Sequence, residues 1–555
     1  MNKGKNLLIT NLLSDISGEE VSAANYFVYN FSRGTINRSE VSTLNDSKKL
    51  QKIALEEKKS YTNFIYQQNQ IFLENDLVFK NNLSLYFLSI FSNKRSEFFS
   101  TYTDYLHQLI LKEILDKNTF KIIYAIGFSD EELRQLKENL KTQIKPFENS
   151  QTSPKKETSN WKLHLFYLYS FFYLVLIKLL FKKTTRQVSK FFYAQYPKHF
   201  TKDFLHKKYG KLVSSGDSYL LSIISDGFHQ LLKPLTFINA LSRLNNKSSE
   251  RYILLESYLK WKDFFGAIIK YHHYKRKFKP LMKKSYVFNE IDLSFQIRKE
   301  LTLSLHQIPR LLMHFEAYKT VFENHNPNKV VYYLHEYIPG RFISYILNTY
   351  FPDIKSLGFQ HGPIAETKLL YALSPLESNG NNYLINVPLP IINLCEDEAS
   401  KKIYNSYGYK NLKILTRIER LSYLELIKRD EVEENTCLIA GGLHDTDQII
   451  QYALNTKIYQ NRKVWIKIHP MVAKTKYNKM INAINHPNLK LANENLSFYL
   501  NKVEEVVFTF SSVGEEALKL NIRTSLLVFG NRINESPLLN HNISNPLLKI
   551  VFVNQ

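Results

Sequence analysis

The feature that most constrains this chain is a regular alternation of short apolar runs and helical segments, which continues from about residue 383 to the end of the 555-residue sequence. The predicted strands occupy 383–387, 412–415, 436–440, 463–468, 488–491, 505–510 and 524–529. Helices are expected to begin near residues 396, 444, 473, 495, 512 and 535. Strands that alternate with helices at this spacing form parallel sheets covered on both faces. The C-terminal part is therefore predicted to be an α/β domain.

The N-terminal half shows the same class of structure with more helix. Strands are expected at 6–10, 121–126, 328–334 and 355–359, and long helices at 252–271 and 291–324. Ser129, with Glu132 three residues later, forms the capping-box pattern of a helix start. A chain of this length exceeds one ordinary core. We therefore expect an N-terminal domain at 1–380, with a helical insertion at about 145–325, and a C-terminal domain at 381–555.

The composition restricts the possible classes of binding partner only in part. The formal net charge of +23 fits nucleic acid, an anionic membrane surface or an anionic substrate. It fits A+T-rich coding equally well, because Lys, Asn, Ile, Tyr and Phe are abundant together, so no nucleic-acid partner is predicted. Cys395 and Cys437 lack the spacing of a zinc site or a disulfide framework. This indicates a reducing compartment, and we expect a cytoplasmic protein.

One segment suggests contact with a membrane. Within 165–181, an uncharged run of about thirteen residues is shorter than the roughly 20 that span a bilayer. Ten basic residues follow and are opposed locally only by Asp203. An aromatic helix beside such a stretch can lie on an anionic leaflet. The alternative is a core helix beside a solvated basic face. The first interpretation makes 161–211 a peripheral contact at the inner face of the cytoplasmic membrane.

Two serines stand where a predicted strand passes into a helix. Ser511 and Ser512 follow the strand at 505–510, so their hydroxyls and the free N–H groups of the first helical turn face one point. The positive end of the helix dipole adds to this anion site. Glu516, one turn further along, is placed to accept hydrogen bonds from ribose hydroxyls. The simpler alternative is an ordinary serine N-cap.

A second candidate for phosphate binding ends the neighbouring strand at 463–468. Pro470 fixes the turn after His469 and leaves the imidazole pointing into a cleft, where it can donate to a phosphate oxygen. Lys467 assists only if its side chain faces the same way. Gly441 and Gly442, after the strand at 436–440, allow a ligand close to the backbone. This glycine pair lacks the spacing of a dinucleotide or P-loop motif, and no DxD-type metal cluster is evident, so a metal-independent reaction without a cofactor is predicted.

The opposite wall of the cleft is expected from two strand ends upstream. Glu336 follows one strand, and His361, before Gly362, follows the next. A carboxylate and an imidazole at adjacent strand ends can activate an acceptor hydroxyl as general bases. His335 is an alternative to Glu336, because neighbouring strand residues face opposite sides. His361 also has a structural alternative, in which it only caps its loop.

These motifs resemble a known group of enzymes. His361-Gly362, Lys467-Ile468-His469-Pro470 and Ser511-Ser512 resemble GT-B glycosyltransferases of bacterial surface polysaccharides, nearest to the polysialyltransferase and capsule Kdo-transferase type and more distantly to teichoic-acid glycerophosphotransferases. The stretch 330–424, with Glu336, GFQHG and TRIERLSYL, is similar to the surface carbohydrate biosynthesis protein family, and so are the opening LLITNLLSDISGEE and residues 193–221.

The resemblance implies two Rossmann-like domains that face a cleft. It implies that His469, Ser511 and Ser512 bind the donor phosphate, commonly of a CMP-sugar or a CDP-alditol. The resemblance implies a carboxylate as the base in the polysialyltransferase type and a His before Gly in the glycerophosphotransferase type. Glu336 and His361 are therefore alternative candidates for the base. The chain lacks the acidic-acidic-Gly triplet of the polysialyltransferases.

The predicted function is inverting, metal-independent transfer of a sugar, such as a nonulosonic acid from a CMP donor, to a lipid-linked or polysaccharide acceptor. The alternatives are a CDP-alditol polyol-phosphate transferase and a non-catalytic protein that binds membranes or polyanions.

Overall fold

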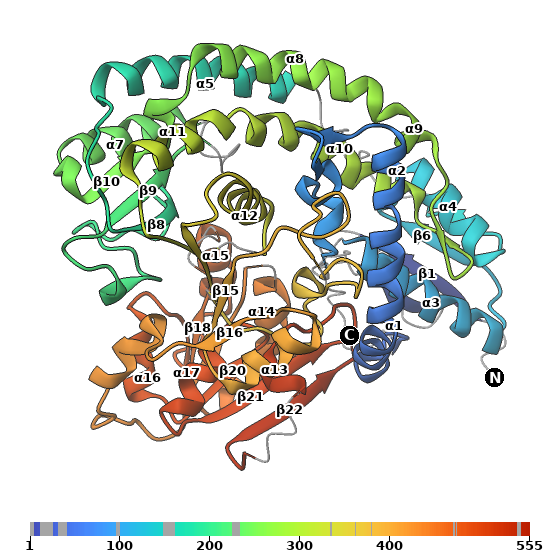
Figure 1. Ribbon diagram of the computed structural model, residues 1–555. Helices are drawn as coiled ribbons and strands as arrows, with labels where there is room; N and C mark the ends of the chain where they lie inside the picture. The colour runs from blue at the N-terminus through green and yellow to red at the C-terminus, as the bar shows by residue number, and fades with distance from the viewer. Residues whose placement is uncertain are drawn as a thin grey trace.

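The computed structural model describes residues 5–11, 26–31, 42–95, 100–147, 161–224, 233–333, 336–360, 362–378, 380–443, 445–469, 472, 474–540 and 545–554. Within these residues, three parallel sheets with connecting helices carry the fold (Figure 1). Two antiparallel hairpins add to them, β4 (Val78–Phe79) with β5 (Leu83–Ser84) and β11 (Val287–Phe288) with β12 (Ile291–Asp292). The predicted α/β class is confirmed.

The first sheet has five strands in the order β3-β2-β1-β6-β7. They are β1 (Asn6–Thr10), β2 (Tyr26–Asn30), β3 (Ser42–Thr43), β6 (Ile123–Ile126) and β7 (Lys145–Pro146). The helices of this region are α1 (Ser47–Gln67), α2 (Asn69–Glu74), α3 (Thr101–Lys117) and α4 (Asp130–Leu140). The Ser129 capping box at the start of α4 is confirmed, with both reciprocal hydrogen bonds formed.

The second sheet has seven strands in the order β10-β9-β8-β13-β14-β15-β16. They are β8 (Lys190–Gln195), β9 (Ser218–Ser222), β10 (Tyr252–Leu254), β13 (Lys329–Tyr332), β14 (Lys355–Phe359), β15 (Ile392–Cys395) and β16 (Leu412–Ile414). Its helices are α5 (Trp161–Leu180), α7 (Pro234–Asn245), α8 (Trp261–Lys277), α9 (Lys279–Lys283), α10 (Ser294–Leu312), α11 (Phe315–His325), α12 (Ile338–Tyr350) and α13 (Glu398–Ser406).

The third sheet has six strands in the order β19-β18-β17-β20-β21-β22. They are β17 (Thr436–Ala440), β18 (Lys463–Lys467), β19 (Leu489–Leu491), β20 (Glu505–Phe508), β21 (Arg523–Phe529) and β22 (Leu548–Val553). Its helices are α14 (Thr446–Asn455), α15 (Lys474–Ile484), α16 (Leu496–Lys502), α17 (Val513–Lys519) and α18 (Pro537–Asn540). Separate buried clusters cover its two faces, because Leu438 and Ala440 point to one and Cys437 and Ile439 to the other.

Sheet membership differs from the predicted domains in two places. Residues 145–325, predicted to be a helical insertion, contribute β8, β9 and β10 to the seven-stranded sheet and also supply most of its helices. The change from this sheet to the six-stranded one falls between Ile414 and Thr436, after the predicted boundary at 380/381. The reason is pairing: β15 and β16 extend the edge next to β14.

Two predicted elements take other conformations. Residues 383–387 form a turn instead of a strand, because the amides of Ile385 and Asn386 both donate to the carbonyl of Asn382. The helix predicted at 252–271 begins only at Trp261. Residues 252–254 are fully apolar and buried, and they pair with β9 as a strand. Tertiary pairing thus overrides a local pattern that fits either element.

Candidate active site

The six-stranded sheet presents a cluster of polar side chains at its carboxyl edge. Asp445 follows β17, Thr509 and Phe510 follow β20, and Arg532 follows β21. The Thr509 hydroxyl donates to Asp445, whose side chain is buried. Arg532 Nη1 lies 3.3 Å from Asp445 Oδ2, and its guanidinium lies 4.1 Å from the centre of the Phe510 ring. The edge therefore holds a buried cation and a buried carboxylate side by side.

His469 follows β18 at the same edge and is half-buried. Burial lowers the pKa of its imidazole, and the nearby charge of Asp445 opposes that shift only in part. A neutral imidazole at this position retains one N–H donor for a ligand oxygen. Pro470, predicted to fix the turn, lies outside the described residues.

Ser511 and Ser512 lie between β20 and the seven-residue helix α17. The Ser512 hydroxyl donates to Glu516 Oε1 at 2.9 Å, and the Tyr423 hydroxyl donates to Glu516 Oε2 at 2.6 Å. Both oxygens predicted to accept from ribose therefore already accept within the protein. Ser511 Oγ is buried and has no hydrogen-bond partner among the described residues. Of the two hydroxyls, that of Ser511 is the one left for a ligand.

The remaining predicted donor-side residues play packing roles in the described structure. A side chain at Gly442 would lie 2.9 Å from the Phe510 ring, so glycine lets this ring pack against the backbone. The Gly441 amide donates to the carbonyl of Lys467 at 2.9 Å, which joins β17 to β18. The Lys467 ammonium donates to the carbonyl of Glu494 and lies 5.6 Å from the centre of the Tyr499 ring. Its contacts are thus with the segment after β19.

The facing edge belongs to the seven-stranded sheet. Glu336 lies between β13 and α12, is 1% exposed, and accepts a hydrogen bond of 3.2 Å from the Tyr371 hydroxyl. Burial raises the pKa of Tyr371, and the Glu336 charge raises it further. Gln360, directly after β14, accepts from the Glu396 amide at 2.9 Å. His361 lies outside the described residues, so of the two predicted bases only Glu336 is located.

One arginine joins the two edges. Arg420 binds both carboxylate oxygens of Glu396 after β15, at 2.7 and 2.6 Å, and reaches Glu515 on α17 at 2.9 Å. These groups line a cavity of about 210 Å³ between the sheets. Lys208 lies nearby: burial and the Arg420 charge lower its pKa to about 8, and the charges of Glu396 and Glu336 oppose that shift. The carboxyl ends of two parallel sheets therefore meet, as in a GT-B-like arrangement.

Sequence reasoning did not assign roles to four of these side chains. Asp445 and Arg532 each follow a correctly predicted strand, and a charged residue at a strand end was the signal that would have identified them. Lys208 was counted with the basic surface stretch but lies at the cleft. Arg420 comes from a 3₁₀ segment, Glu419–Leu426, with no strand-end signal. Within the described ranges, no group of three or more His, Cys, Asp or Glu side chains is arranged to hold a metal ion.

No protein-family model matches the sequence, and no curated protein matches it. Similar solved structures include UDP-GlcNAc 2-epimerase from Neisseria meningitidis bound to UDP-GlcNAc, at 14% identity and a TM-score of 0.37, covering 66% of this chain and 87% of that one. Wall teichoic acid polymerase TagF is similar at 8% identity and a TM-score of 0.27, and the match covers 67% of this chain and 79% of that one. The catalytic domain of starch synthase IV from Arabidopsis thaliana is similar at 6% identity and a TM-score of 0.27, and the match covers 44% of this chain and 66% of that one.

Proposed function

We propose that this chain is a glycosyltransferase that moves a sugar from a nucleotide donor to a lipid-linked or polysaccharide acceptor. The meeting of two carboxyl sheet edges, each with buried polar groups, carries the proposal. Ligands of open α/β sheets bind outside the carboxyl ends of the strands. A cleft with two such edges can hold the donor against one sheet and the acceptor against the other.

The donor nucleotide is assigned to the six-stranded sheet. His469 and Ser511 are the proposed donors; they follow β18 and β20, which lie on either side of β17, and the Ser511 hydroxyl has no hydrogen-bond partner among the described residues. Arg532 places a guanidinium that can donate to phosphate at the same edge, with its charge balanced by Asp445. Charge-assisted hydrogen bonds of this kind are the stronger ones. Ser512 is proposed to contribute through its backbone amide, because its hydroxyl hydrogen is donated to Glu516.

The reaction assigned to the cleft is an inverting, metal-independent displacement. Glu336 removes the proton of an acceptor hydroxyl, the oxygen attacks the anomeric carbon, and the bond from that carbon to the nucleotide phosphate breaks. His361 is the alternative base. Glu336 is preferred because its carboxylate lies at the facing edge, buried and within hydrogen-bond distance of the Tyr371 hydroxyl. The proposed donor is a CMP-linked nonulosonic acid.

Nucleotide titration tests the donor side. Calorimetry with CMP, CDP, UDP and GDP should detect binding of a cytidine nucleotide. His469→Ala and Ser511→Ala should each weaken that binding by about tenfold, as expected for loss of one hydrogen bond to a charged group. His272→Ala, exposed on α8, is the matched control and should leave the affinity unchanged. Failure of all four nucleotides to bind would contradict the proposal.

A second variant separates binding from transfer. Glu336→Gln should keep the nucleotide affinity but lower the transfer rate by about 10²- to 10⁴-fold, the usual contribution of a general base. A CDP-alditol that is consumed while CMP-sugars are not would identify a polyol-phosphate transferase instead. Binding that is salt-sensitive, equal for all polyanions and unchanged in the His469 variant would identify a non-catalytic scaffold.

The acceptor side is proposed to lie on an anionic membrane. Helix α5 contains an 18-residue stretch, Leu163–Leu180, long and apolar enough to cross a bilayer by length and composition, with 39% of it buried. It is thus longer than the run of about thirteen residues found in the sequence. Its buried stripe, which includes Phe166, Tyr173 and Ile177, packs into the protein. This packing favours a helix that lies on the membrane surface over one that spans the bilayer.

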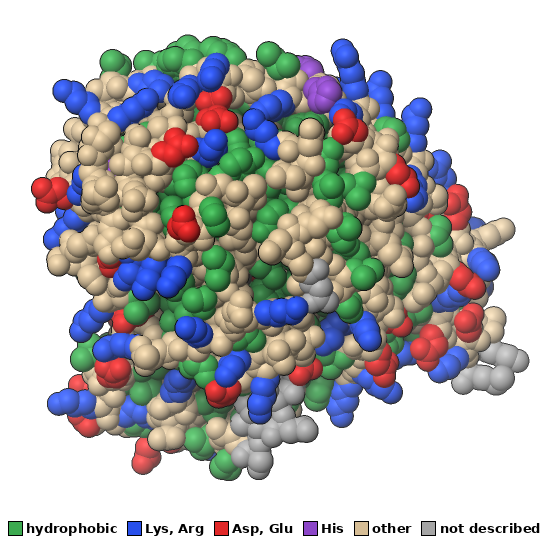
Figure 2. All heavy atoms as spheres, viewed as in Figure 1, with side chains coloured by type: hydrophobic (Ala, Val, Ile, Leu, Met, Phe, Trp, Pro, Cys, Tyr) green, Lys and Arg blue, Asp and Glu red, His purple; other side chains and the backbone are tan. Residues whose placement is uncertain are grey.

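The outward face continues from α5 onto α8. Phe172 is 54% exposed and Ile269 71% exposed, and the Phe171 and Trp261 rings lie 5.4 Å apart between the helices. Figure 2 shows hydrophobic side chains along the top edge, where Figure 1 places α5 and α8, with Lys and Arg beside them. An apolar face rimmed by cations matches an anionic leaflet. The proposed contact therefore moves from 161–211 to α5 and α8.

Vesicle binding tests this contact. The protein should sediment with vesicles of phosphatidylserine and phosphatidylcholine, and Phe172→Glu/Ile269→Glu should abolish sedimentation because the new charges face the lipid. Leu426→Glu, at a site 83% exposed in the C-terminal half, is the control. Equal sedimentation of all three proteins would exclude this face as the contact.

A further inference from the structure

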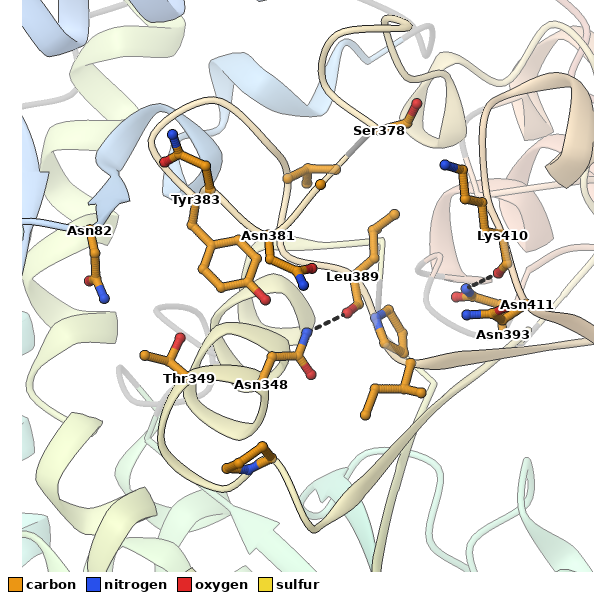
Figure 3. A pocket seen from close by; sticks show the side chains of 16 residues that line it. Asn82, Asn348, Thr349, Ser378, Asn381, Tyr383, Leu389, Asn393, Lys410 and Asn411 are labelled. Carbon is orange, nitrogen blue, oxygen red and sulfur yellow. Dashed lines mark hydrogen bonds between the residues drawn. The ribbon is translucent and has the colours of Figure 1, made fainter.

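A cavity of about 530 Å³ opens at the amino edge of the seven-stranded sheet, a strand's length from the cleft. Figure 3 shows the side chains that line it. They come from the β4–β5 turn, the end of α12, the loop before β15, β15 itself and the turn before β16. Its size is that of a ligand pocket. Nothing in the transfer reaction uses it.

The lining has an unusual chemical composition. Six of its sixteen residues are asparagines, namely Asn82, Asn348, Asn381, Asn382, Asn393 and Asn411. Among the sixteen, Lys410 is the one charged side chain. An amide both donates and accepts hydrogen bonds, as a sugar hydroxyl does. A lining without a carboxylate does not fit a metal ion, and its neutral amides outnumber its single cation.

The amides are held in place before any ligand arrives. Asn348 donates to the carbonyl of Leu389 at 2.9 Å, Asn393 donates to that of Lys410 at 3.2 Å, and the Tyr345 hydroxyl donates to Asn82 at 2.5 Å. In Figure 3 the Tyr383 ring lies among these amides, with Asn381 beside its hydroxyl end. The Tyr383 ring is 8% exposed and packs edge-on against the Tyr345 ring, with 5.8 Å between the ring centres, so it stiffens the cavity wall. A preformed lining reduces the entropic cost of binding.

Two buried oxygen atoms lack partners. Asn393 is 1% exposed, and its Oδ1 has no hydrogen-bond partner among the described residues. The same holds for Thr349 Oγ1 on α12. A buried polar atom without a partner carries an uncompensated desolvation penalty. A hydroxyl-rich ligand supplies the missing partners.

We propose that this cavity is a second carbohydrate site, which binds a neutral oligosaccharide at the sheet edge opposite the transfer cleft. The assignment does not rest on the proposed transferase activity. A glycan that is bound here through its inner sugar units stays attached to the protein, while its remaining sugar units are free.

The full chain should be applied to an array of neutral and acidic oligosaccharides, with calorimetry on the glycans retained. We expect retention of neutral oligosaccharides, weakened by about tenfold or more in Thr349→Val/Asn381→Ala, since two hydrogen bonds are lost. Thr349→Val keeps the side-chain shape, and Asn381 is exposed, so both variants should fold. Asn405→Ala, exposed on α13 outside the cavity, is the matched control.

Three results would overturn the proposal: no neutral oligosaccharide retained, retention unchanged in the double variant, or retention of acidic glycans only with loss on Lys410→Ala. Nucleotide binding, measured on the same preparations, should be unaffected by the double variant. Failure of the carbohydrate site and failure of the transfer cleft are thereby distinguished.

Discussion

At the scale of single residues, the fold depends on a few fully buried ions. Lys94 and Glu377 are both 0% exposed, and the ammonium lies 2.8 and 3.0 Å from the two carboxylate oxygens. Lys94 also donates to the carbonyl of Ala372 at 3.1 Å. Burial lowers the pKa of Lys94, and Glu377 opposes the shift. The pair ties the N-terminal helical region to the loop before β15.

Removing one partner should be far more costly than removing both. Lys94→Met leaves the Glu377 charge buried and alone, so the free energy of unfolding should fall by about 3 to 5 kcal/mol. Lys94→Met/Glu377→Leu should recover most of that loss. Lys52→Met, whose exposed pair with Glu56 spans 3.8 Å, should change stability little. Urea denaturation measures all three, and equal losses in both Lys variants would contradict the account.

At the scale of elements, a local sequence signal decides the secondary structure of a segment where tertiary packing does not favour a different one. Helix α4 begins at a capping box in which the Glu132 amide donates to Ser129 Oγ at 3.3 Å, and the Ser129 amide donates to Glu132 Oε2 at 2.8 Å. Both partners lie within three residues, so sequence alone identifies the helix start. The strand β10 shows the opposite case, because its partner β9 is thirty residues away.

The cap makes a measurable contribution. Ser129→Ala should lower the free energy of unfolding by about 1 kcal/mol, because one helix amide loses its acceptor. Ser285→Ala, at an exposed serine outside any helix or strand, is the control and should have no effect. The two melting curves compare the variants directly. A coincident pair of curves would show that the cap does not limit stability.

The interface of α3 and α10 carries a pH dependence. Burial raises the pKa of both Asp104 and Glu300 to about 7. Their unfolded values lie near 4, so the folded state holds more protons between pH 4 and 7. The free energy of unfolding therefore falls as pH rises through this window, on the order of 1 to 2 kcal/mol because both groups keep some contact with water.

Substituting the pair should remove this slope. Asp104→Asn/Glu300→Gln should be more stable relative to wild type at pH 7.5 than at pH 4.5, in urea denaturation at roughly unit pH steps. Asp116→Asn, at an exposed residue of α3, should follow the wild-type profile. Parallel profiles for wild type and the double variant would show that these carboxyls titrate normally.

At the scale of the whole molecule, contacts between distant segments assemble three sheets into one body. Asn45, after β3, donates to the carbonyl of Gly530 after β21 at 3.3 Å, and the Thr367 hydroxyl donates to that of Asn534 at 2.7 Å. Arg420 binds Glu396 and Glu515 across the cleft. The cleft is therefore bridged by a salt bridge, and hydrogen bonds from side chains to backbone carbonyls join the sheets beside it.

Breaking the Arg420 bridge should weaken the whole assembly. Arg420→Met leaves two largely buried carboxylates without their cation, and the free energy of unfolding should fall by about 3 kcal/mol. Arg523→Met, whose side chain is 63% exposed and lies 3.5 Å from Glu504, should cost little. Chemical denaturation of both variants provides the measurement. An Arg420 variant as stable as the Arg523 variant would show that the bridge does not hold the sheets together.

The sequence by itself determined the α/β class, the order of strands and helices between residues 412 and 540, and the helix start at Ser129. It did not predict β22. Apolar periodicity and capping are encoded within a few residues of each position, so they can be predicted locally. The same reasoning located Glu336, His469 and Ser511 at strand ends. Their binding and catalytic roles stay predictions.

Only the tertiary structure decided which strands share a sheet. It placed β8 to β10 in a seven-stranded sheet, moved β15 and β16 across the expected boundary, and brought Arg420 between Glu396 and Glu515. It also directed the Lys467 ammonium to Glu494 and joined Glu516 to Tyr423. Pairing and ion contacts between residues far apart in the chain depend on the free energy of the whole assembly. That free energy cannot be inferred from a local sequence pattern.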